Sequence, residues 1–299
     1  MKQVINYITP AITPLLPNGK VDYASCERLY NYLIDGGVNG VLLLGSSGEF
    51  FGISMEEKKE LIDFAVKCID KRVELVVGTT SMILDEIVEL SDYALKAGAD
   101  AVMVIMPYYF HFDDGSVFDY YDELAQRIDG RLYIYNYPDR TGYTISPAVV
   151  RALAEKHENI VGIKDTISGV DHTREVIKAV RDVRPDFLVY SGFDDNFVHN
   201  VLCGGNGCMA AMSNLYPQLT TAWTMAARNG DYDQLQEIQQ KINKIMDVYA
   251  VGKPFVPFIK EAMVMKHIID YAVSTKPMPA ANEEQKARIR EILDWYEKG

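Results

Sequence analysis

The sequence predicts an α/β protein whose fold is a (β/α)8 barrel, the TIM barrel. The first observation is an alternation of short apolar runs, rich in Val, Ile, Leu and Tyr, with segments whose apolar residues recur at helical spacing. The second is that eight such runs lie between residues 8 and 212. The third is size, because 299 residues with 48% hydrophobic content can bury the core of a barrel, whose usual length is about 250 residues.

A doubly wound parallel sheet is the main alternative to the barrel. Its best sequence signatures are a GxGxxG or GxxxxGK[ST] motif after the first strand, and neither pattern follows the first apolar run. We therefore favour the barrel. Its expected strands, in chain order, are 8–15, 40–45, 74–79, 101–107, 132–138, 160–166, 187–192 and 207–212.

Helical segments separate these strands, and two of them have clear start signals. Ser54 followed by Glu57 is a capping box, and Ser146 before Pro147 places proline at the first helical position. The best defined helices are 54–69, 84–97, 147–157 and 171–180. Because the chain after the eighth strand also has helical character and no Pro/Gly/Ser-rich linker divides it, we expect a barrel domain over residues 1–225 and a helical extension packed on it over 226–299.

Composition and charge exclude several classes of protein. The net charge of −12 and the pI near 4.9 argue against a nucleic-acid partner, since such proteins gather Lys and Arg into basic patches. No apolar run approaches the ~20 residues that span a bilayer, and the N-terminus lacks the apolar region of a secretory signal. We expect a cytoplasmic protein without a membrane partner.

The cysteines and histidines give no sign of a metal centre. The four cysteines, Cys26, Cys68, Cys203 and Cys208, form neither CxxC pairs nor zinc-finger spacing, which fits buried thiols in a reducing compartment. The five histidines contain no HExxH pair. We expect no catalytic metal.

The sixth expected strand carries a lysine where a charge is costly. In residues 160–166, IVGIKDT, period two places Lys164 on the same face as Ile160 and Gly162. A strand that faces a packed barrel interior must either pair this charge or lower the lysine pKa. A lysine whose pKa is lowered by about three units is a usable amine near neutral pH and can form an imine. The alternative is a structural lysine paired with a carboxylate such as Asp165.

Three other strand ends carry groups suited to proton transfer or anion binding. The fifth strand puts Tyr133, Tyr135 and Tyr137 on one face, where they are either core aromatics or phenols that shuttle protons. Residues 45–49, GSSGE, follow the second strand and can present N–H groups and hydroxyls to a small carboxylate. Residues 107–109, PYY, end the fourth strand with two phenols. Taken singly, each segment is ordinary loop or core material.

In this order and at these strand ends, the segments resemble the dihydrodipicolinate synthase/N-acetylneuraminate lyase family of class I pyruvate aldolases. The similarity spans nearly the whole chain. It is carried by Thr9-Pro10 and Thr13-Pro14, GSSGE at 45–49, PYY at 107–109, YNYP at 135–138, GIKDT at 162–166, Ser191-Gly192 and GGNG at 204–207.

The resemblance implies covalent catalysis on pyruvate. Lys164 would form the imine and Tyr135 would be the proton shuttle, while Ser47 and Tyr109 would continue the proton relay. No cofactor would be required, because the imine itself is the electron sink. The substrate-binding positions implied by the family are Ser46, Ser47, Arg140, Thr166, Gly192 and the backbone of Met209. The resemblance further implies a homotetramer built as a dimer of dimers, with Tyr109 crossing a subunit interface.

Two features of the sequence point to different aldehyde partners. Four segments are most similar to 2-keto-3-deoxygluconate-type aldolases: residues 162–167 (GIKDTI), Asp171-His172, residues 253–256 (KPFV) and residues 259–262 (IKEA). By contrast, Arg140 stands where dihydrodipicolinate synthases use an arginine to grip the carboxylate of the second substrate. Ser81-Met82 occupies the place where lysine-inhibited synthases carry asparagine, so feedback inhibition by lysine is not expected.

Three functions are therefore open at the level of the sequence. The first is a 2-keto-3-deoxy sugar acid aldolase, and the second is a synthase that condenses pyruvate with aspartate semialdehyde. The third belongs to another class, a catalytically inactive barrel that binds sugar acids or regulates. Lys164 argues against the third function, because a sensor needs no nucleophile.

Overall fold

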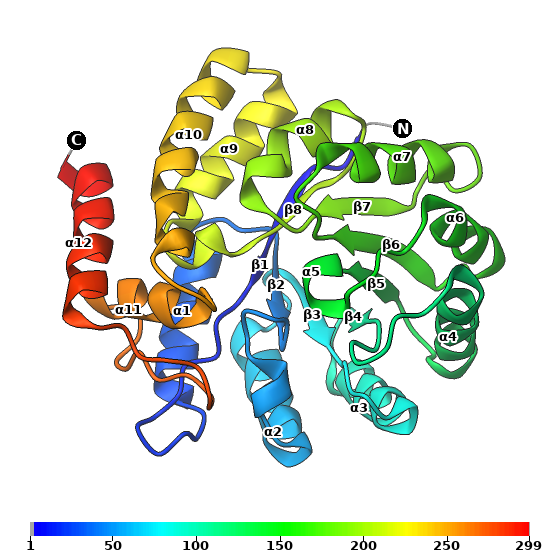
Figure 1. Cartoon of the computed structure of the whole chain (residues 1–299), viewed down its shortest axis with the longest axis horizontal. Coiled ribbons are helices and arrows are strands. Elements are labelled where there is room, and N and C mark those ends of the chain that lie inside the picture. The colour runs from blue at the N-terminus through cyan, green and yellow to red at the C-terminus, as the bar shows by residue number, and fades with distance from the viewer. Residues whose placement is uncertain (1–2, 299) are drawn as a thin grey trace. The chain divides into compact units, whose positions relative to one another are not determined.

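The chain forms the predicted barrel, with eight parallel strands closed in the order β1 to β8 (Figure 1). The computed structural model describes residues 3–298. The strands are β1 Asn6–Pro10, β2 Gly40–Leu43, β3 Glu74–Gly78, β4 Ala101–Ile105, β5 Leu132–Asn136, β6 Ile160–Asp165, β7 Leu188–Ser191 and β8 Gly207–Met209.

Helices follow the strands as the alternation of the sequence predicts. The α-helices are α1 Tyr23–Asp35, α2 Met55–Ile69, α3 Leu84–Ala97, α4 Asp114–Arg127, α5 Pro138–Thr141, α6 Pro147–Lys156, α7 Val170–Arg181, α8 Phe197–Leu202, α9 Pro217–Asn229, α10 Tyr232–Ile245, α11 Val256–Met265 and α12 Glu283–Lys298. Short 3-10 turns are η1 Phe50–Gly52, η2 Asp194–Asn196, η3 Ala211–Asn214 and η4 Met246–Ala250.

The expected strands were too long at their carboxyl ends. The predicted strand 101–107 ends at Ile105, and the predicted strand 132–138 ends at Asn136 because Pro138 begins α5. Residues just beyond the strands, such as Met106 and Tyr137, are still buried, so the apolar run continues after the strand pairing has stopped. The first strand begins at Asn6 and ends at Pro10, where the expected 8–15 continued through prolines that cannot donate to a strand partner.

Both predicted helix starts are confirmed. The Ser54 hydroxyl accepts a hydrogen bond from the Glu57 N–H at 3.2 Å, and the Glu57 carboxylate accepts from the Ser54 hydroxyl at 3.1 Å. Ser146 caps α6 by accepting from the Val149 N–H at 3.3 Å, with proline in the first turn. The side chains thus satisfy backbone donors that have no partner inside the helix.

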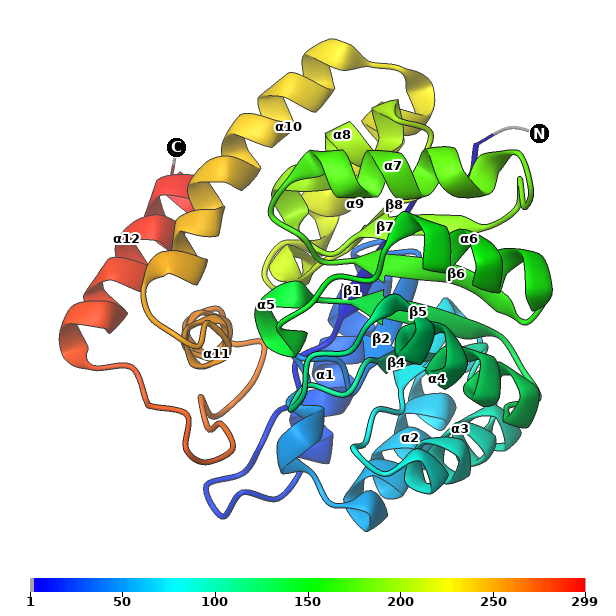
Figure 2. The ribbon, with the colours of Figure 1, turned by 45° about the vertical axis from the view of Figure 1, so that its right-hand side comes forward.

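The part of the chain that the structure describes consists of two compact units. One unit contains residues 3–7 and Leu75–Ala210, and so carries the fourth to eighth strands with α3 to α8. The other contains Ile8–Glu74 and residues 211–298, with β2, α1, α2 and the helices after β8. In the second unit, α12 lies beside α10 in both ribbon views (Figures 1 and 2). The expected domain division after residue 225 falls within α9 and stays a prediction.

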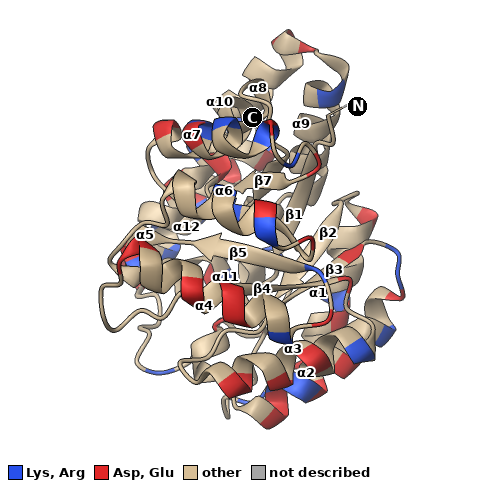
Figure 3. Cartoon of the chain, turned by 90° about the vertical axis from the view of Figure 1, so that its right-hand side faces the viewer, with Lys and Arg blue, Asp and Glu red and all other residues tan. Residues whose placement is uncertain are grey.

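Several helices carry both acidic and basic side chains (Figure 3). Figure 3 shows Lys and Arg interspersed with Asp and Glu on α2, α6 and α7, in a chain whose net charge is −12. Within residues 3–298, we find no helix that is both long enough and apolar enough to cross a membrane.

Candidate active site

Lys164 lies near the carboxyl end of β6 and is buried, with 3% of its surface exposed. The alternation of β6 places Gly162 on the same face, and this glycine is required by its surroundings. A Cβ at Gly162 would lie 2.4 Å from the Leu188 carbonyl oxygen and 2.8 Å from Cε1 of Tyr133. The space beside Gly162 is therefore filled by the Tyr133 ring.

Burial lowers the pKa of the Lys164 amine from 10.5 to about 8, although the nearby Cys208 and Asp194 side chains act in the opposite direction. The low-dielectric surroundings disfavour the charged ammonium. With a pKa near 8, roughly a tenth of the lysine is the neutral amine at neutral pH. The Lys164 amine is thus buried, with a lowered pKa and no paired carboxylate among the described residues.

Asp165 does not pair with Lys164, which overturns the alternative of a structural salt bridge between them. Successive strand residues point to opposite faces, and the Asp165 carboxylate binds groups on its own side. Oδ1 accepts from the Asn136 amide at 2.7 Å, and Oδ2 accepts from the Thr173 hydroxyl at 2.5 Å. His172 Nδ1 lies 3.0 Å from the same Oδ2. Among the described residues, Lys164 forms no ion pair.

Tyr135 is the tyrosine of β5 that meets the lysine. Its residue pairs in register with Lys164, and the Lys164 Nζ lies 4.5 Å from the centroid of the Tyr135 ring. Tyr133 instead packs against Gly162 and lies 6.3 Å from the Tyr190 ring. Tyr135 is 3% exposed, so a proton that it moved would be sheltered from bulk water.

Tyr137 closes the same row of rings with a packing role. Its ring makes an edge contact with Phe193 at 6.0 Å, and burial raises the pKa of its phenol to about 12. The phenol therefore stays protonated at neutral pH.

Thr166 and Gly192 lie against each other at the ends of β6 and β7. A Cβ at Gly192 would lie only 1.8 Å from the Thr166 hydroxyl oxygen, so no larger residue fits. The Thr166 hydroxyl oxygen is buried and has no hydrogen-bond partner within the described chain. A buried polar atom without a partner is costly, which makes this hydroxyl available to a ligand.

Asp194 and Cys208 are the two side chains whose charges act on the Lys164 amine. Asp194 opens η2, is 2% exposed and accepts a hydrogen bond from the Tyr7 hydroxyl. Burial raises the pKa of the Cys208 thiol well above its usual range, so this side chain is neutral. Because neighbouring strand residues alternate in direction, Met209 can present only its backbone to the side of β8 on which Cys208 and Lys164 interact.

Arg140 and Tyr109 lie at the surface of this unit. Arg140 belongs to α5, is exposed, and places its guanidinium 4.9 Å from the centroid of the Tyr137 ring. It donates to the Asp139 carbonyl at 3.4 Å and forms no ion pair with the Asp139 carboxylate. Tyr109 is 81% exposed and lies 5.0 Å from the Phe110 ring. Neither side chain is held in the buried cluster around Lys164.

Ser46 and Ser47 belong to the other unit, in the loop that follows β2. Ser47 is buried, Ser46 is partly exposed, and the Ser46 carbonyl accepts from the Glu49 N–H at 3.2 Å. The backbone at Leu44 and at Glu49 is left-handed, with φ of 53° and 57°. The loop is therefore a tight turn with a strained residue at either end.

The structure brings together Lys164 and Tyr135, whereas sequence reasoning missed two buried charged features. Asp194 was missed although it stands two residues after Gly192, and an acidic residue after a barrel strand was the available signal. The buried ion pair between Glu49 and Lys260 gave no local signal, because the two residues are far apart in the sequence.

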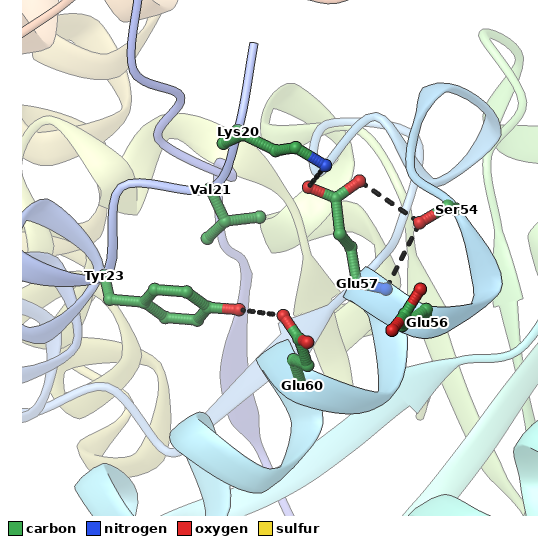
Figure 4. Close-up of a pocket in the computed structure, with 7 residues that line it drawn as sticks. All are labelled: Lys20, Val21, Tyr23, Ser54, Glu56, Glu57 and Glu60. Carbon is green, nitrogen blue, oxygen red and sulfur yellow. Dashed lines mark hydrogen bonds and ion pairs between the residues drawn. The ribbon is translucent and has the colours of Figure 1, made fainter. Parts of the chain in front are cut away.

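A hollow lies between the loop before α1 and the start of α2 (Figure 4). Its volume is about 260 Å³. Its polar groups already bind one another, since Lys20 pairs with Glu57 at 3.3 Å and the Tyr23 hydroxyl donates to Glu60 at 3.2 Å. We do not assign a function to it.

The Dihydrodipicolinate synthetase family model matches residues 3–295. YagE of Escherichia coli (strain K12), named provisionally as a 2-dehydro-3-deoxy-D-gluconate aldolase, is 36% identical over 96% of this chain and 95% of its own length. The 4-hydroxy-tetrahydrodipicolinate synthase of Kosmotoga olearia is 34% identical over 94% of this chain and 93% of its own.

A solved structure shows sequence identity in the same range as these relatives. The crystal structure of YagE in complex with pyruvate superimposes with a TM-score of 0.94 and 34% sequence identity, and covers 98% of both chains. The similarity therefore extends over nearly the whole chain.

Proposed function

Because this chain belongs to the dihydrodipicolinate synthetase family, we propose that it is a class I aldolase that captures pyruvate as an imine on Lys164. The main observation in support of this proposal is the buried Lys164 amine, whose pKa is lowered to about 8 and which lies 4.5 Å from the centroid of the Tyr135 ring. A buried lysine without a paired carboxylate is costly for folding and useful for nucleophilic catalysis. The enzyme is a lyase, as the aldolases and synthases among its relatives are.

In the proposed reaction, the neutral Lys164 amine attacks the ketone carbon of pyruvate, and water leaves as the imine forms. Loss of a proton from the methyl carbon gives an enamine, which attacks an aldehyde carbon in the direction of synthesis. In the reverse direction, a 4-hydroxy-2-keto acid loses its hydroxyl proton as the C3–C4 bond breaks. The protonated imine takes up the electron pair, so this sequence of steps needs no metal or nucleotide cofactor.

Tyr135 is the group proposed to move the proton, since it is the phenol that adjoins Lys164. Ser47 and Tyr109 would continue the relay. Ser46, Ser47 and the hydroxyl of Thr166 would bind pyruvate, and the absence of a protein partner for the Thr166 hydroxyl within the described chain supports its part.

A sugar-acid substrate is the first choice for the aldehyde partner, with aspartate semialdehyde as the second. The similarity to YagE and to YjhH, named provisionally as a 2-dehydro-3-deoxy-D-pentonate aldolase and 34% identical, supports a 2-keto-3-deoxy sugar acid. The exposed guanidinium of Arg140 supports the second choice, because it can bind a carboxylate with two hydrogen bonds.

Parallel assays of the purified enzyme decide between these substrates. We expect a larger kcat/KM for cleavage of 2-keto-3-deoxygluconate than for condensation of pyruvate with aspartate semialdehyde. Arg140→Ala should lower kcat/KM for the substrate that reacts after pyruvate, the aldehyde partner, by one to two decades, roughly 1.4–3 kcal/mol. The same change should leave imine formation intact. A loss confined to the acidic aldehyde, together with the larger kcat/KM for it, would instead establish the synthase.

The imine is tested by reduction with borohydride in the presence of pyruvate. We expect one reduced adduct per chain in the intact mass, located on Lys164 by peptide mapping. Lys164→Ala should give none. An unmodified wild-type chain would favour a sugar-acid-binding barrel without catalysis, and an adduct that persists in Lys164→Ala would place the nucleophile elsewhere.

A homotetramer built from dimers, in the cytoplasm, completes the proposal. The exposure of Tyr109 (81%) and Phe110 (67%) supports an interface at this loop, since large aromatic side chains are rarely left in water side by side. Light scattering on the purified protein measures the assembly.

A further inference from the structure

The loop that carries Ser46 and Ser47 has an unusual backbone. Leu44 and Glu49, at its two ends, have φ angles of 53° and 57°. Residues with side chains rarely adopt this left-handed conformation, and leucine is among those least suited to it. Such a backbone persists only where the surroundings hold it in place.

The C-terminal part of the chain supplies this support through the Glu49 side chain. Glu49 Oε1 lies 2.5 Å from Nζ of Lys260 in α11, and neither side chain has any exposed surface. Glu49 Oε2 accepts from the N–H and the hydroxyl of Thr275, at 2.7 and 2.9 Å. The Lys260 ammonium also donates to the Val273 carbonyl at 2.6 Å. Three groups from residues 260–275 thus fix one carboxylate.

Two further contacts restrain the same loop. The Gly48 carbonyl accepts from the Thr13 hydroxyl at 2.7 Å. A Cβ at Gly52 would lie 2.5 Å from the Cβ of Thr275, so Thr275 also packs directly on the turn that follows Glu49. The chain is therefore restrained on both sides of Glu49, at Gly48 before it and at Gly52 after it.

Stability alone does not explain a fully buried ion pair here. Removing both charges from water is costly, and apolar residues of similar size often stabilise a fold equally well. An apolar pair could not, however, accept the two hydrogen bonds that Thr275 donates to Glu49, nor donate the one from Lys260 to Val273. The arrangement is suited to placing a loop accurately.

We propose that Glu49, Lys260 and Thr275 are positioning residues, which hold the loop of residues 44–49 so that Ser46 and Ser47 can bind the carboxylate of pyruvate. The inference rests on the proposed function, in which these serines bind that carboxylate. It gives helix α11 a role in substrate binding, although Lys260 itself touches no substrate.

The expected consequence is a change in pyruvate binding with little change in the chemical step. The carboxylate keeps its charge throughout the reaction, so contacts to it stabilise the ground state and the transition state alike. Lys260→Met should raise the pyruvate concentration that half-saturates borohydride trapping about tenfold or more, while the trapping rate at saturation falls less than threefold. Thr275→Val keeps the shape of the side chain and removes one donor, and should raise half-saturation about threefold.

The matched control is Lys266→Met. Lys266 follows the last residue of α11 and pairs with Glu297 at 2.5 Å, so this variant removes a lysine and an ion pair from the same region without touching the loop. Its half-saturation should equal that of the wild type. Circular dichroism and thermal unfolding of each variant establish that the compared proteins are folded.

The outcomes separate this inference from the proposed function. If the wild type is not trapped with pyruvate, the proposed function fails. If the wild type is trapped and folded Lys260→Met keeps its half-saturation within twofold, the positioning role is wrong. Should Lys260→Met not fold, Thr275→Val decides, because unchanged half-saturation in that variant overturns the inference and a rise absent from Lys266→Met supports it.

Discussion

At Lys164, burial lowers the pKa of the amine, and this shift is both unfavourable for folding and a source of reactivity. The pKa of the amine is 10.5 in its usual environment and about 8 in the folded chain. Between these two values the unfolded chain binds the additional proton, so the free energy of unfolding rises with pH across this window. Below pH 8 both states are protonated, and the full penalty for the buried charge applies.

The first pH prediction follows from this difference. Lys164→Met should be more stable than the wild type at pH 7, by up to roughly 3 kcal/mol, because the methionine carries no charge. The advantage should shrink between pH 8 and pH 10.5, as the buried amine of the wild type becomes neutral. Urea unfolding of both proteins across this range measures the effect.

The rate of imine formation should depend on pH with a midpoint near 8, the pKa of the buried Lys164 amine. At low pyruvate, borohydride trapping by the wild type should increase with pH and level off above about pH 8. A midpoint near pH 10.5 would show that burial does not lower the pKa of the Lys164 amine.

The next prediction concerns Tyr135. Tyr135→Phe removes one hydroxyl and keeps the ring beside Lys164, so the fold should be preserved. Loss of a positioned acid–base group should lower kcat by about 10²–10⁴. Steady-state kinetics with the preferred substrate test this, and an unchanged kcat would return Tyr135 to the role of a core aromatic.

At the scale of elements, the Asp165 side chain joins β6 to α7 and to the loop before α6. His172, in the first turn of α7, places Nδ1 3.0 Å from Asp165 Oδ2 and Nε2 2.9 Å from the Ile145 carbonyl. The Ile145 N–H in turn donates to the Asn136 side chain at 3.1 Å. Both imidazole nitrogens thus face acceptors, an arrangement that suits a protonated ring.

The pKa of His172 reflects two opposing causes. Burial lowers it, but the hydrogen bond and the negative charge of Asp165 outweigh burial and raise the pKa above 6.5. A group with a raised folded-state pKa stabilises the fold fully below its unfolded pKa, and this contribution is lost as pH rises through the folded value.

The prediction for this element is a stability difference that depends on pH. The free energy of unfolding of the wild type should exceed that of His172→Gln most strongly below pH 6.5, and the difference should decline at higher pH. Chemical denaturation at a series of pH values tests it. A difference that stays constant from acidic to alkaline pH would mean that His172 is neutral throughout.

At the scale of the whole molecule, local sequence patterns predicted the barrel because its parts repeat. Each strand is a short apolar run and each helix has its own period and cap, as Ser54 and Ser146 illustrate. Strand ends were predicted less well, because burial continues through residues such as Met106 after strand pairing has ended.

The candidate site divides in the same way. Lys164 could be predicted because period two on β6 places a lysine among buried residues, which is a local anomaly. Its neighbour Asp165 could not be assigned from the sequence, since the choice between Lys164 and His172 as its partner depends on the direction of the side chain and on the start of α7.

The sequence by itself determined the alternation of strands and helices and the position of Lys164 on a strand of otherwise buried residues, because each is set by residues close together in the chain. Only the tertiary structure decided that Lys260 pairs with Glu49 and that Thr166 lies against Gly192. Such pairs form between segments that meet when the strands assemble into the barrel. Their partners are therefore chosen by three-dimensional packing, which periodicity along the chain does not encode.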